Sequence, residues 1–234
     1  MPDSVDRQTP LDPNFLDSVS ILNQSKIVYW ACHGTLLGLV RDGALIEWDH
    51  DVDFAMWSGA AGKADLISRF IDRGFELKSD GQDYDFLTFS RTGGRQVDIN
   101  FYRKDDLRDI AYSEWFIASD PWFVRLTNAL VEGESYGGRF KRIARVLAVF
   151  RPLAIAARNM AGDRKPQRKS AGYTTPLSML NRFTNLSIQG VSVCVPEDYE
   201  KVLEYLYGKD WRTPKPSYNW VTDSPATQVS SNRF

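Results

Sequence analysis

The chain has 234 residues, of which 43% are hydrophobic and 25% charged, values typical of one globular domain or one domain with a large insertion. Its formal net charge of −1 excludes a general attraction to nucleic acid or anionic lipid, so such binding would need a local basic patch. Cys32 and Cys194 are too isolated in the sequence for a zinc motif. No uncharged apolar run is long enough to span a membrane, and the polar start MPDSVDRQTP predicts no signal peptide. These two features favour a cytoplasmic protein.

The N-terminal third predicts a helix, a strand, a second helix and a second strand. Residues 1–11 are expected to form a flexible tail, and Asp12-Pro13 is typical of a helix start. The apolar run 27–32 predicts a buried strand. Gly34-Thr35 then opens the short helical stretch LLGLVR, and residues 51–57 predict the second strand.

Further along the chain, residues 63–73 have the apolar spacing of an amphipathic helix and end at Gly74. A short strand at 75–78 follows. Residues 85–91 and 96–102 then predict a hairpin, because Gly93-Gly94 between them is a strong turn signal. The second strand of this hairpin contains Asp98 between Val97 and Ile99, and an aspartate inside a strand more often faces a site than a core.

Residues 103–172 predict a helical insertion whose later part is strongly basic. Between residues 139 and 169 ten lysines and arginines stand against the single acid Asp163, a local charge of +9. Three interpretations stay open: a solvated helix with one packed face, a helix lying on an anionic membrane, and a nucleic-acid contact.

The C-terminal part predicts a hairpin followed by a helix. Residues 186–188 and 191–195 flank Gln189-Gly190, and a helix should run from Pro196 to Tyr207, with Gly208 ending it. Residues 217–234 are expected to form a second flexible tail.

Three aspartates at alternating positions, Asp49, Asp51 and Asp53, form the most informative pattern in the chain. Side chains two residues apart in a strand lie on one face, so these carboxylates should share a side. Clustered carboxylates repel one another and favour a bound cation, and oxygen ligands favour Mg²⁺ or Mn²⁺. The alternative is a solvated acidic loop before the strand.

A Gly-Thr turn after a strand, Asp51-x-Asp53 on the next strand and Asp98 on a later one form the pattern of the nucleotidyltransferase superfamily. The stretch GTLLGLVRDGALIEWDHDVDFAM closely resembles the signature of the LicD/fukutin family, which runs Gly-Thr-Leu-Leu-Gly, then Arg, then Ile-Pro-Trp-Asp-x-Asp-x-Asp. A second similar block is VSVCVPEDYEKVLEYLYGKDW. Glu47 stands where that family usually has proline, which leaves the aspartates intact.

This resemblance implies an α/β fold, with a mixed sheet in a single nucleotidyltransferase-like domain. It also implies an enzyme that transfers a substituted phosphate, such as phosphocholine or a polyol phosphate, from a CDP-activated alcohol to a glycan hydroxyl, in cell-surface polysaccharide or lipopolysaccharide modification. A lipid-linked acceptor would bring the protein to a membrane through residues 139–169; no nucleic-acid partner is expected.

The same resemblance assigns roles to individual residues. Asp51, Asp53 and Asp98 would bind two Mg²⁺ or Mn²⁺ ions and carry the catalysis, and Asp98 could also accept the proton of the attacking hydroxyl. Four further positions would contact the substrate: Gly34, Thr35, Arg41 and Asp49.

For some of these residues the sequence leaves alternatives open. Arg41 fits a phosphate clamp or an ion pair with Asp42 or Asp49. Thr35 fits a phosphate contact or a helix cap. His33 fits a structural position better than an acid–base role, and Trp48 fits core packing better than stacking on a base or sugar.

Two other functions also stay open. One is transfer of a nucleoside monophosphate from an NTP to a small molecule or protein. The other is a membrane-surface module built on residues 139–169.

Overall fold

A computed structural model describes residues 10–60, 62–79, 86–118, 152, 155 and 168–230. The chain divides into two compact units. One unit comprises Met1–Trp115 and Gly172–Gln228, and the other comprises Phe116–Ala171 and Val229–Phe234. All candidate site residues named above lie in the first unit.

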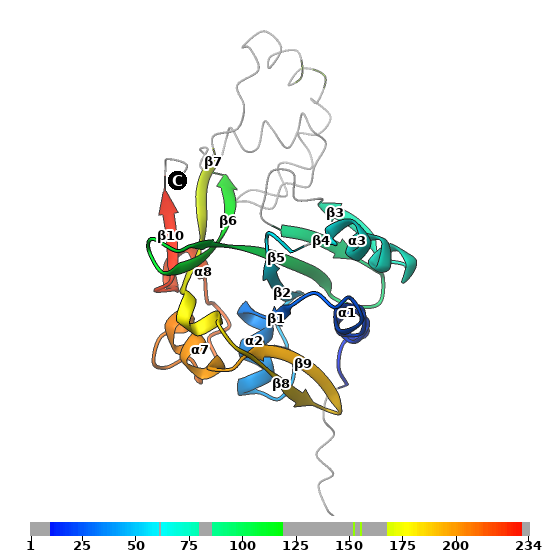
Figure 1. Cartoon of the computed structure of the whole chain (residues 1–234), viewed down its shortest axis with the longest axis horizontal. Helices are drawn as coiled ribbons and strands as arrows, with labels where there is room; N and C mark the ends of the chain where they lie inside the picture. The colour runs from blue at the N-terminus through cyan, green and yellow to red at the C-terminus, as the bar shows by residue number, and fades with distance from the viewer. Residues whose placement is uncertain are drawn as a thin grey trace, which may run out of the picture. The chain divides into compact units, whose positions relative to one another are not determined.

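The elements of the N-terminal half follow the predicted order closely up to residue 102 (Figure 1). They are α1 (Pro13–Gln24), β1 (Tyr29–Ala31), α2 (His33–Arg41), β2 (Asp51–Trp57), α3 (Lys63–Asp72), β3 (Glu76–Ser79), β4 (Phe86–Ser90), β5 (Gln96–Asp105) and β6 (Ile110–Ala118).

The C-terminal elements include the predicted hairpin and helix. They are β7 (Arg168–Pro176), the 3₁₀ helix η2 (Leu177–Leu180), β8 (Phe183–Ile188), β9 (Val191–Pro196), α7 (Tyr199–Tyr207), α8 (Trp220–Asp223) and β10 (Thr227–Ser230).

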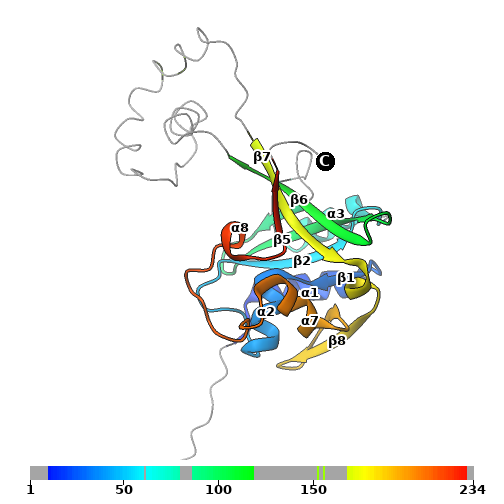
Figure 2. The ribbon, with the colours of Figure 1, turned by 90° about the vertical axis from the view of Figure 1, so that its left-hand side faces the viewer.

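The main sheet of the described residues is mixed, and β5 is its central strand. Its strand order is β1-β2-β5-β6-β7-β10, with β4 also pairing with β5 and β3 pairing with β4. β2 lies parallel to β5, whereas β1, β4 and β6 run antiparallel to their neighbours. β8 and β9 form a separate two-stranded sheet, which lies with α7 beside α2 (Figures 1 and 2). The expected mixed α/β fold is therefore confirmed.

The two faces of β2 and β5 differ in chemistry because side chains alternate along a strand. Val52, Phe54 and Met56 of β2 are buried in the main core together with Val97 and Ile99 of β5. Helix α1 covers this face, where the Phe15 ring stacks on Phe54 at a centroid distance of 6.0 Å. The opposite face of the same strands is therefore left for the polar residues between these apolar ones.

The start of α1 fixes the turn that leads into β5. Asp12 caps the helix by accepting hydrogen bonds from two amides of its first turn, and its other oxygen accepts one from the Arg95 amide at 3.0 Å. Asn14 is fully buried and donates to the carbonyls of Arg91 and Arg95, each at 2.8 Å. Its own side-chain oxygen accepts a bond from Arg91 Nε at 2.9 Å.

Two sequence expectations about secondary structure are wrong. The first part of the predicted helical insertion is extended, because β5 continues to Asp105 and β6 follows. Asp105 accepts hydrogen bonds from the amides of Leu107 and Arg108 and so closes a turn that the sequence reading missed. The predicted C-terminal tail contains α8 and β10, and Asn219 caps α8 by accepting a bond from the Val221 amide.

Most of the basic segment 139–169, like residues 1–9 and 231–234, lies outside the described residues, so its proposed membrane or nucleic-acid contact stays a prediction. Among the residues that are described, no helix has the length and apolar character needed to cross a membrane.

Replacing Asn14 with alanine should lower the free energy of unfolding by about 2–4 kcal/mol, because three buried hydrogen bonds lose a partner at once. Urea denaturation followed by circular dichroism measures this change. The exposed Gln24→Ala variant at the other end of α1 should change stability by less than about 0.5 kcal/mol. A similar loss in both variants would contradict the role of Asn14.

Candidate active site

The parallel register of β2 and β5 brings the predicted carboxylates together. Asp53 is the direct neighbour of Asp98 across the two strands, and Asp51 lies two residues before Asp53 on the same face. The loop before β2 adds Asp49, whose carboxyl group lies close enough to that of Asp51 to be affected by its charge. We call these four residues the carboxylate cluster. All four are partly buried.

Burial and mutual repulsion raise the pKa values within this cluster. Burial, followed by the charges of Asp51, Asp98 and Asp49, holds the pKa of Asp53 well above its usual range. Burial first, and then the neighbouring carboxyl group of Asp51, raise the pKa of Asp49 to about 7. Burial raises the pKa of Asp98 to about 6, with the charge of Asp51 adding to it.

Nearby polar side chains hold the carboxylates in place. Asn100 Nδ2 donates to Asp53 Oδ1 at 3.2 Å and to the Phe54 carbonyl at 3.3 Å. Gln96 Nε2 lies within hydrogen-bond distance of both oxygens of Asp98. Asn100 was not picked out from the sequence, although its position two residues after Asp98 places it on the same face of β5.

The Gly-Thr turn at the start of α2 supports the cluster from the helix side. Thr35 is buried, and its hydroxyl accepts a hydrogen bond from the Asp53 amide at 2.7 Å, so it joins α2 to β2. A side chain at Gly34 would collide with Asp49, since a Cβ atom there would lie 2.3 Å from Asp49 Oδ2. A side chain at this position would therefore displace the Asp49 carboxylate from the cluster.

Two arginines near the cluster differ in their partners. Arg41 Nε and Nη2 donate to the two oxygens of Asp42 at 2.8 and 2.7 Å, so of its two alternatives the structure shows the ion pair. Arg95 lies close enough to Asp49 for its charge to lower the pKa of that carboxyl group. Its Nη1 atom is buried and has no hydrogen-bond partner among the described residues.

His33 and Trp48 complete the residues singled out from the sequence. The His33 ring is buried and stacks on Tyr173 at a centroid distance of 4.4 Å. Burial lowers the pKa of His33 to about 3, so the ring is neutral at physiological pH, as expected of a structural histidine. Trp48 is not a core residue, because 41% of its surface is exposed.

The carboxylate cluster offers the oxygen ligands that a cation site needs, but its side chains are not yet gathered around one point. Among the described residues no three Asp, Glu, His or Cys side chains already converge as metal ligands. The donors are all carboxylate oxygens, and in the described part of the chain no ion pair with lysine or arginine neutralises Asp51, Asp53 or Asp98. Their oxygens and uncompensated charge fit Mg²⁺ or Mn²⁺ better than zinc.

Comparison with known proteins shows which family the N-terminal half of the chain resembles. Residues 26–128 match the model of the LicD/FKTN/FKRP nucleotidyltransferase domain. This matched segment contains the whole carboxylate cluster, and the resemblance carried by the GTLLGLVRDGALIEWDHDVDFAM motif is confirmed. The match does not extend to the second similar block near residue 200.

The particular relative found is human ribitol 5-phosphate transferase FKRP, which is 28% identical over 118 residues. The alignment covers 42% of this chain but only 24% of the length of that relative.

Two solved structures also resemble this chain. One is the lincosamide antibiotic adenylyltransferase LnuA, with a TM-score of 0.42, 11% identity and coverage of 83% of this chain and 86% of that one. The other is the antibiotic-resistance factor ANT(2'')-Ia, with a TM-score of 0.34, 14% identity and coverage of 64% and 96%. Both likenesses are weak and concern the fold alone.

Asp98→Asn should stabilise the metal-free protein at pH 8 by about 1–3 kcal/mol and leave its stability at pH 4 nearly unchanged. The pKa of Asp98 is raised from 3.8 to about 6, so the native state binds its proton more tightly than the unfolded state does. The stability of the wild type should therefore fall as pH rises from about 4 to about 6, and the variant lacks this loss. Urea denaturation in EDTA at both pH values measures the effect, and equal shifts at both pH values would contradict it.

Proposed function

We propose that the protein is a metal-dependent transferase that moves a substituted phosphate, of the polyol-phosphate or phosphocholine type, from a CDP-activated alcohol to a glycan hydroxyl. The observation that carries this proposal is the placement of Asp53 beside Asp98, with Asp51 next to them, inside the matched nucleotidyltransferase domain. The name of the human relative favours a polyol phosphate such as ribitol 5-phosphate as the group transferred.

Asp51, Asp53 and Asp98 would hold Mg²⁺ or Mn²⁺. When bound, such ions neutralise phosphate oxygens and stabilise both the attacking and the leaving oxygen. Burial first, and then mutual repulsion, disfavours the charged forms of Asp53 and Asp98, so a bound cation would offset a cost already present in the protein.

The reaction exchanges one phosphorus–oxygen bond for another. The acceptor hydroxyl oxygen bonds to the phosphorus atom that carries the alcohol, the bond from that phosphorus to the CMP oxygen breaks, and CMP leaves with the electron pair. The hydroxyl proton needs a base. Asp98 fits this role, because its carboxyl group lies directly across the paired strands from Asp53, at the proposed reaction centre.

Arg95 is better placed than Arg41 to bind a phosphate of the donor. Arg41 already donates two hydrogen bonds to Asp42. Arg95 lies beside Asp49 with a buried, unsatisfied guanidinium nitrogen, which costs free energy until an acceptor arrives. A phosphate oxygen supplies such an acceptor, and the guanidinium geometry suits it. The exposed Trp48, next to Asp49 in sequence, is available to stack on the cytosine base or a sugar.

Replacing Asp53 with asparagine should lower turnover by about 100-fold or more, because the carboxylate is lost while the side-chain shape is kept. The assay incubates the full chain with CDP-ribitol, CDP-glycerol or CDP-choline and Mg²⁺ or Mn²⁺, and measures CMP. EDTA should abolish the release. Asp65→Asn is the matched control, since Asp65 is exposed on α3 and pairs with Arg69 away from the cluster.

Two outcomes would contradict this proposal. Equal CMP release by wild type and Asp53→Asn would exclude the carboxylate cluster as the reaction centre. Pyrophosphate release from an NTP, with no CMP from any CDP-alcohol, would make the protein a transferase of nucleoside monophosphates instead.

Arg95→Ala should raise the KM for the CDP-alcohol by about tenfold or more and change kcat less, because it removes a contact made with bound donor. Arg95→Lys should recover only part of the affinity, since a lysine cannot form the paired contacts of a guanidinium. Arg69→Ala on the exposed face of α3 serves as the matched control. Values of kcat and KM that both stay unchanged would place Arg95 outside the donor site.

A further inference from the structure

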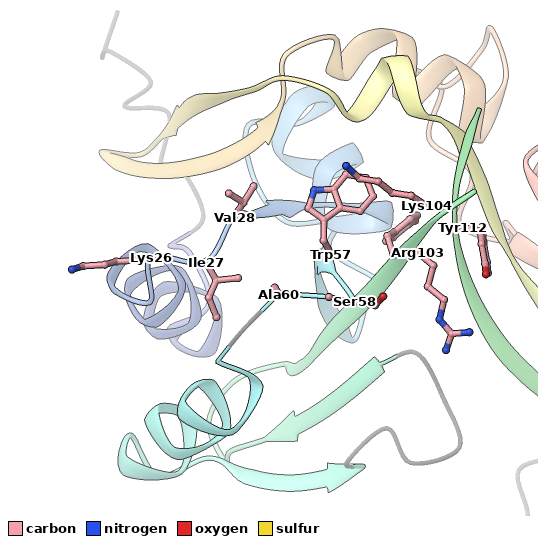
Figure 3. Close-up of a pocket in the computed structure, with 11 residues that line it drawn as sticks. Lys26, Ile27, Val28, Trp57, Ser58, Ala60, Arg103, Lys104 and Tyr112 are labelled. Atoms are coloured by element: carbon pink, nitrogen blue, oxygen red, sulfur yellow. The ribbon is translucent and has the colours of Figure 1, made fainter. Parts of the chain in front are cut away.

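A pocket of about 820 Å³ lies near the C-terminal ends of β2 and β5, a volume suited to a small ligand (Figure 3). Trp57 and Ser58 come from the end of β2, and Tyr102 and Lys104 from the end of β5. Lys26, in the loop before β1, lines the pocket as well. We call it the basic-aromatic pocket.

This pocket is separate from the carboxylate cluster. Trp57 and Tyr102 are neighbours across β2 and β5, four residues after Asp53 and Asp98. At about 3.3 Å per residue, this places the two sites roughly 13 Å apart along the strands. Trp30 and Ala55 are buried against Tyr102 in the same small core cluster, so packed side chains occupy the face between the two sites.

The charge of the pocket is entirely positive. Lys26, Arg103 and Lys104 line it, and none of its eleven lining residues is acidic. The Lys104 ammonium lies over the Trp57 ring, 4.5 Å from the ring centroid, and within the described ranges neither Lys26 nor Lys104 forms an ion pair. Such a surface attracts an anion.

Lys26 is also held at the pocket in an uncommon backbone conformation. Its φ angle is +60°, in the left-handed region that glycine or asparagine adopts more readily than lysine. The neighbouring Ile27 amide donates to Ser25 Oγ at 3.2 Å, which fixes this turn. In Figure 3 the ammonium group of Lys26 points away from Trp57, so Lys26 adds to the positive potential at the edge of the pocket without contacting that ring.

The aromatic and hydroxyl groups indicate what else the ligand contains. Trp57 and Tyr112 are partly exposed, whereas Tyr102 is nearly fully buried beside them. Exposed aromatic rings pack against the C–H face of a sugar, and the hydroxyls of Ser58 and Tyr112 can bond to sugar hydroxyls.

We propose that the basic-aromatic pocket binds an anionic saccharide, a sugar ring that carries phosphate or carboxylate groups. Under the proposed function, on which this part of the inference rests, that sugar is a unit of the acceptor glycan, bound away from the reacting hydroxyl. Binding itself requires neither the CDP-alcohol nor a divalent ion, so it can be tested even if the proposed transfer reaction is wrong.

The test is an NMR titration of the ¹⁵N-labelled full chain in EDTA with glucose 1-phosphate, glucose or inorganic phosphate. The indole signal of Trp57, assigned from Trp57→Phe, should shift in a saturable way with glucose 1-phosphate. Glucose and phosphate alone should bind at least about tenfold more weakly, because each lacks one part of the recognised ligand. Binding should weaken between 100 and 500 mM NaCl, roughly as expected for screened charges.

The variant Lys26→Gln/Lys104→Gln should raise the Kd for glucose 1-phosphate by about tenfold. Lys201→Gln, which removes a charge from the exposed face of α7, should leave the Kd unchanged. Thermal unfolding checks that the variants are folded. If the double variant is unfolded, the salt titration and the comparison of the three ligands, both made on the wild type, test the proposal instead.

Three results would overturn the proposal. The first is an unchanged Kd in the folded double variant. The second is binding of phosphate as tight as that of glucose 1-phosphate, which would remove the sugar from the recognised ligand. The third is a shift of the Asp51 and Asp53 amides without one at Trp57, which would place the ligand in the carboxylate cluster.

Discussion

The parallel pairing of β2 with β5 imposes the main constraint on this molecule. Its register sets Asp53 against Asp98, and alternation along β2 adds Asp51 to the same face. Three like charges at this spacing oppose folding, and burial of Asp53 increases the cost. The rest of the first unit must therefore supply enough stability to keep the two strands in this register.

That stability comes from the reverse side of the same strands. Val52, Phe54, Val97 and Ile99 are completely buried there, and a register shift of one residue would exchange them with the aspartates. Apolar packing thus fixes the geometry of the polar face. Thr35 and Asn100 then hold the Asp53 amide and carboxylate from opposite sides.

Features that depend on a local sequence pattern were predicted correctly from the sequence. The alternation in β2, the cap at Asp12 and the turn at Gly93-Gly94 each carry their own signal, so most elements of the N-terminal half were placed within a few residues. Asp51 and Asp53 were found because they belong to the family motif, and Asp98 because an aspartate inside an apolar strand is unusual. The pairing of β2 with β5 brings them together.

The features that were missed depend on contacts between distant parts of the chain. In the sequence Arg95 is an ordinary turn residue, and only the folded structure brings it close enough to affect Asp49. β6 was taken for helix because its aromatic residues fit either period, and only pairing with β5 decides between them. Trp48 was expected in the core because tryptophan is usually well buried, yet its loop leaves it exposed.

The hydrogen bonds of Asp12 and Asn14 to the turn before β5 have a consequence for where the functional domain begins. The segment shared with the LicD/FKTN/FKRP family starts at residue 26, after the whole of α1. A fragment cut at that point would retain every carboxylate but lose the groups that fix the backbone of Arg95 and the ring that covers Phe54. A fragment that keeps these contacts must therefore be longer than the family match and begin at or before Asp12.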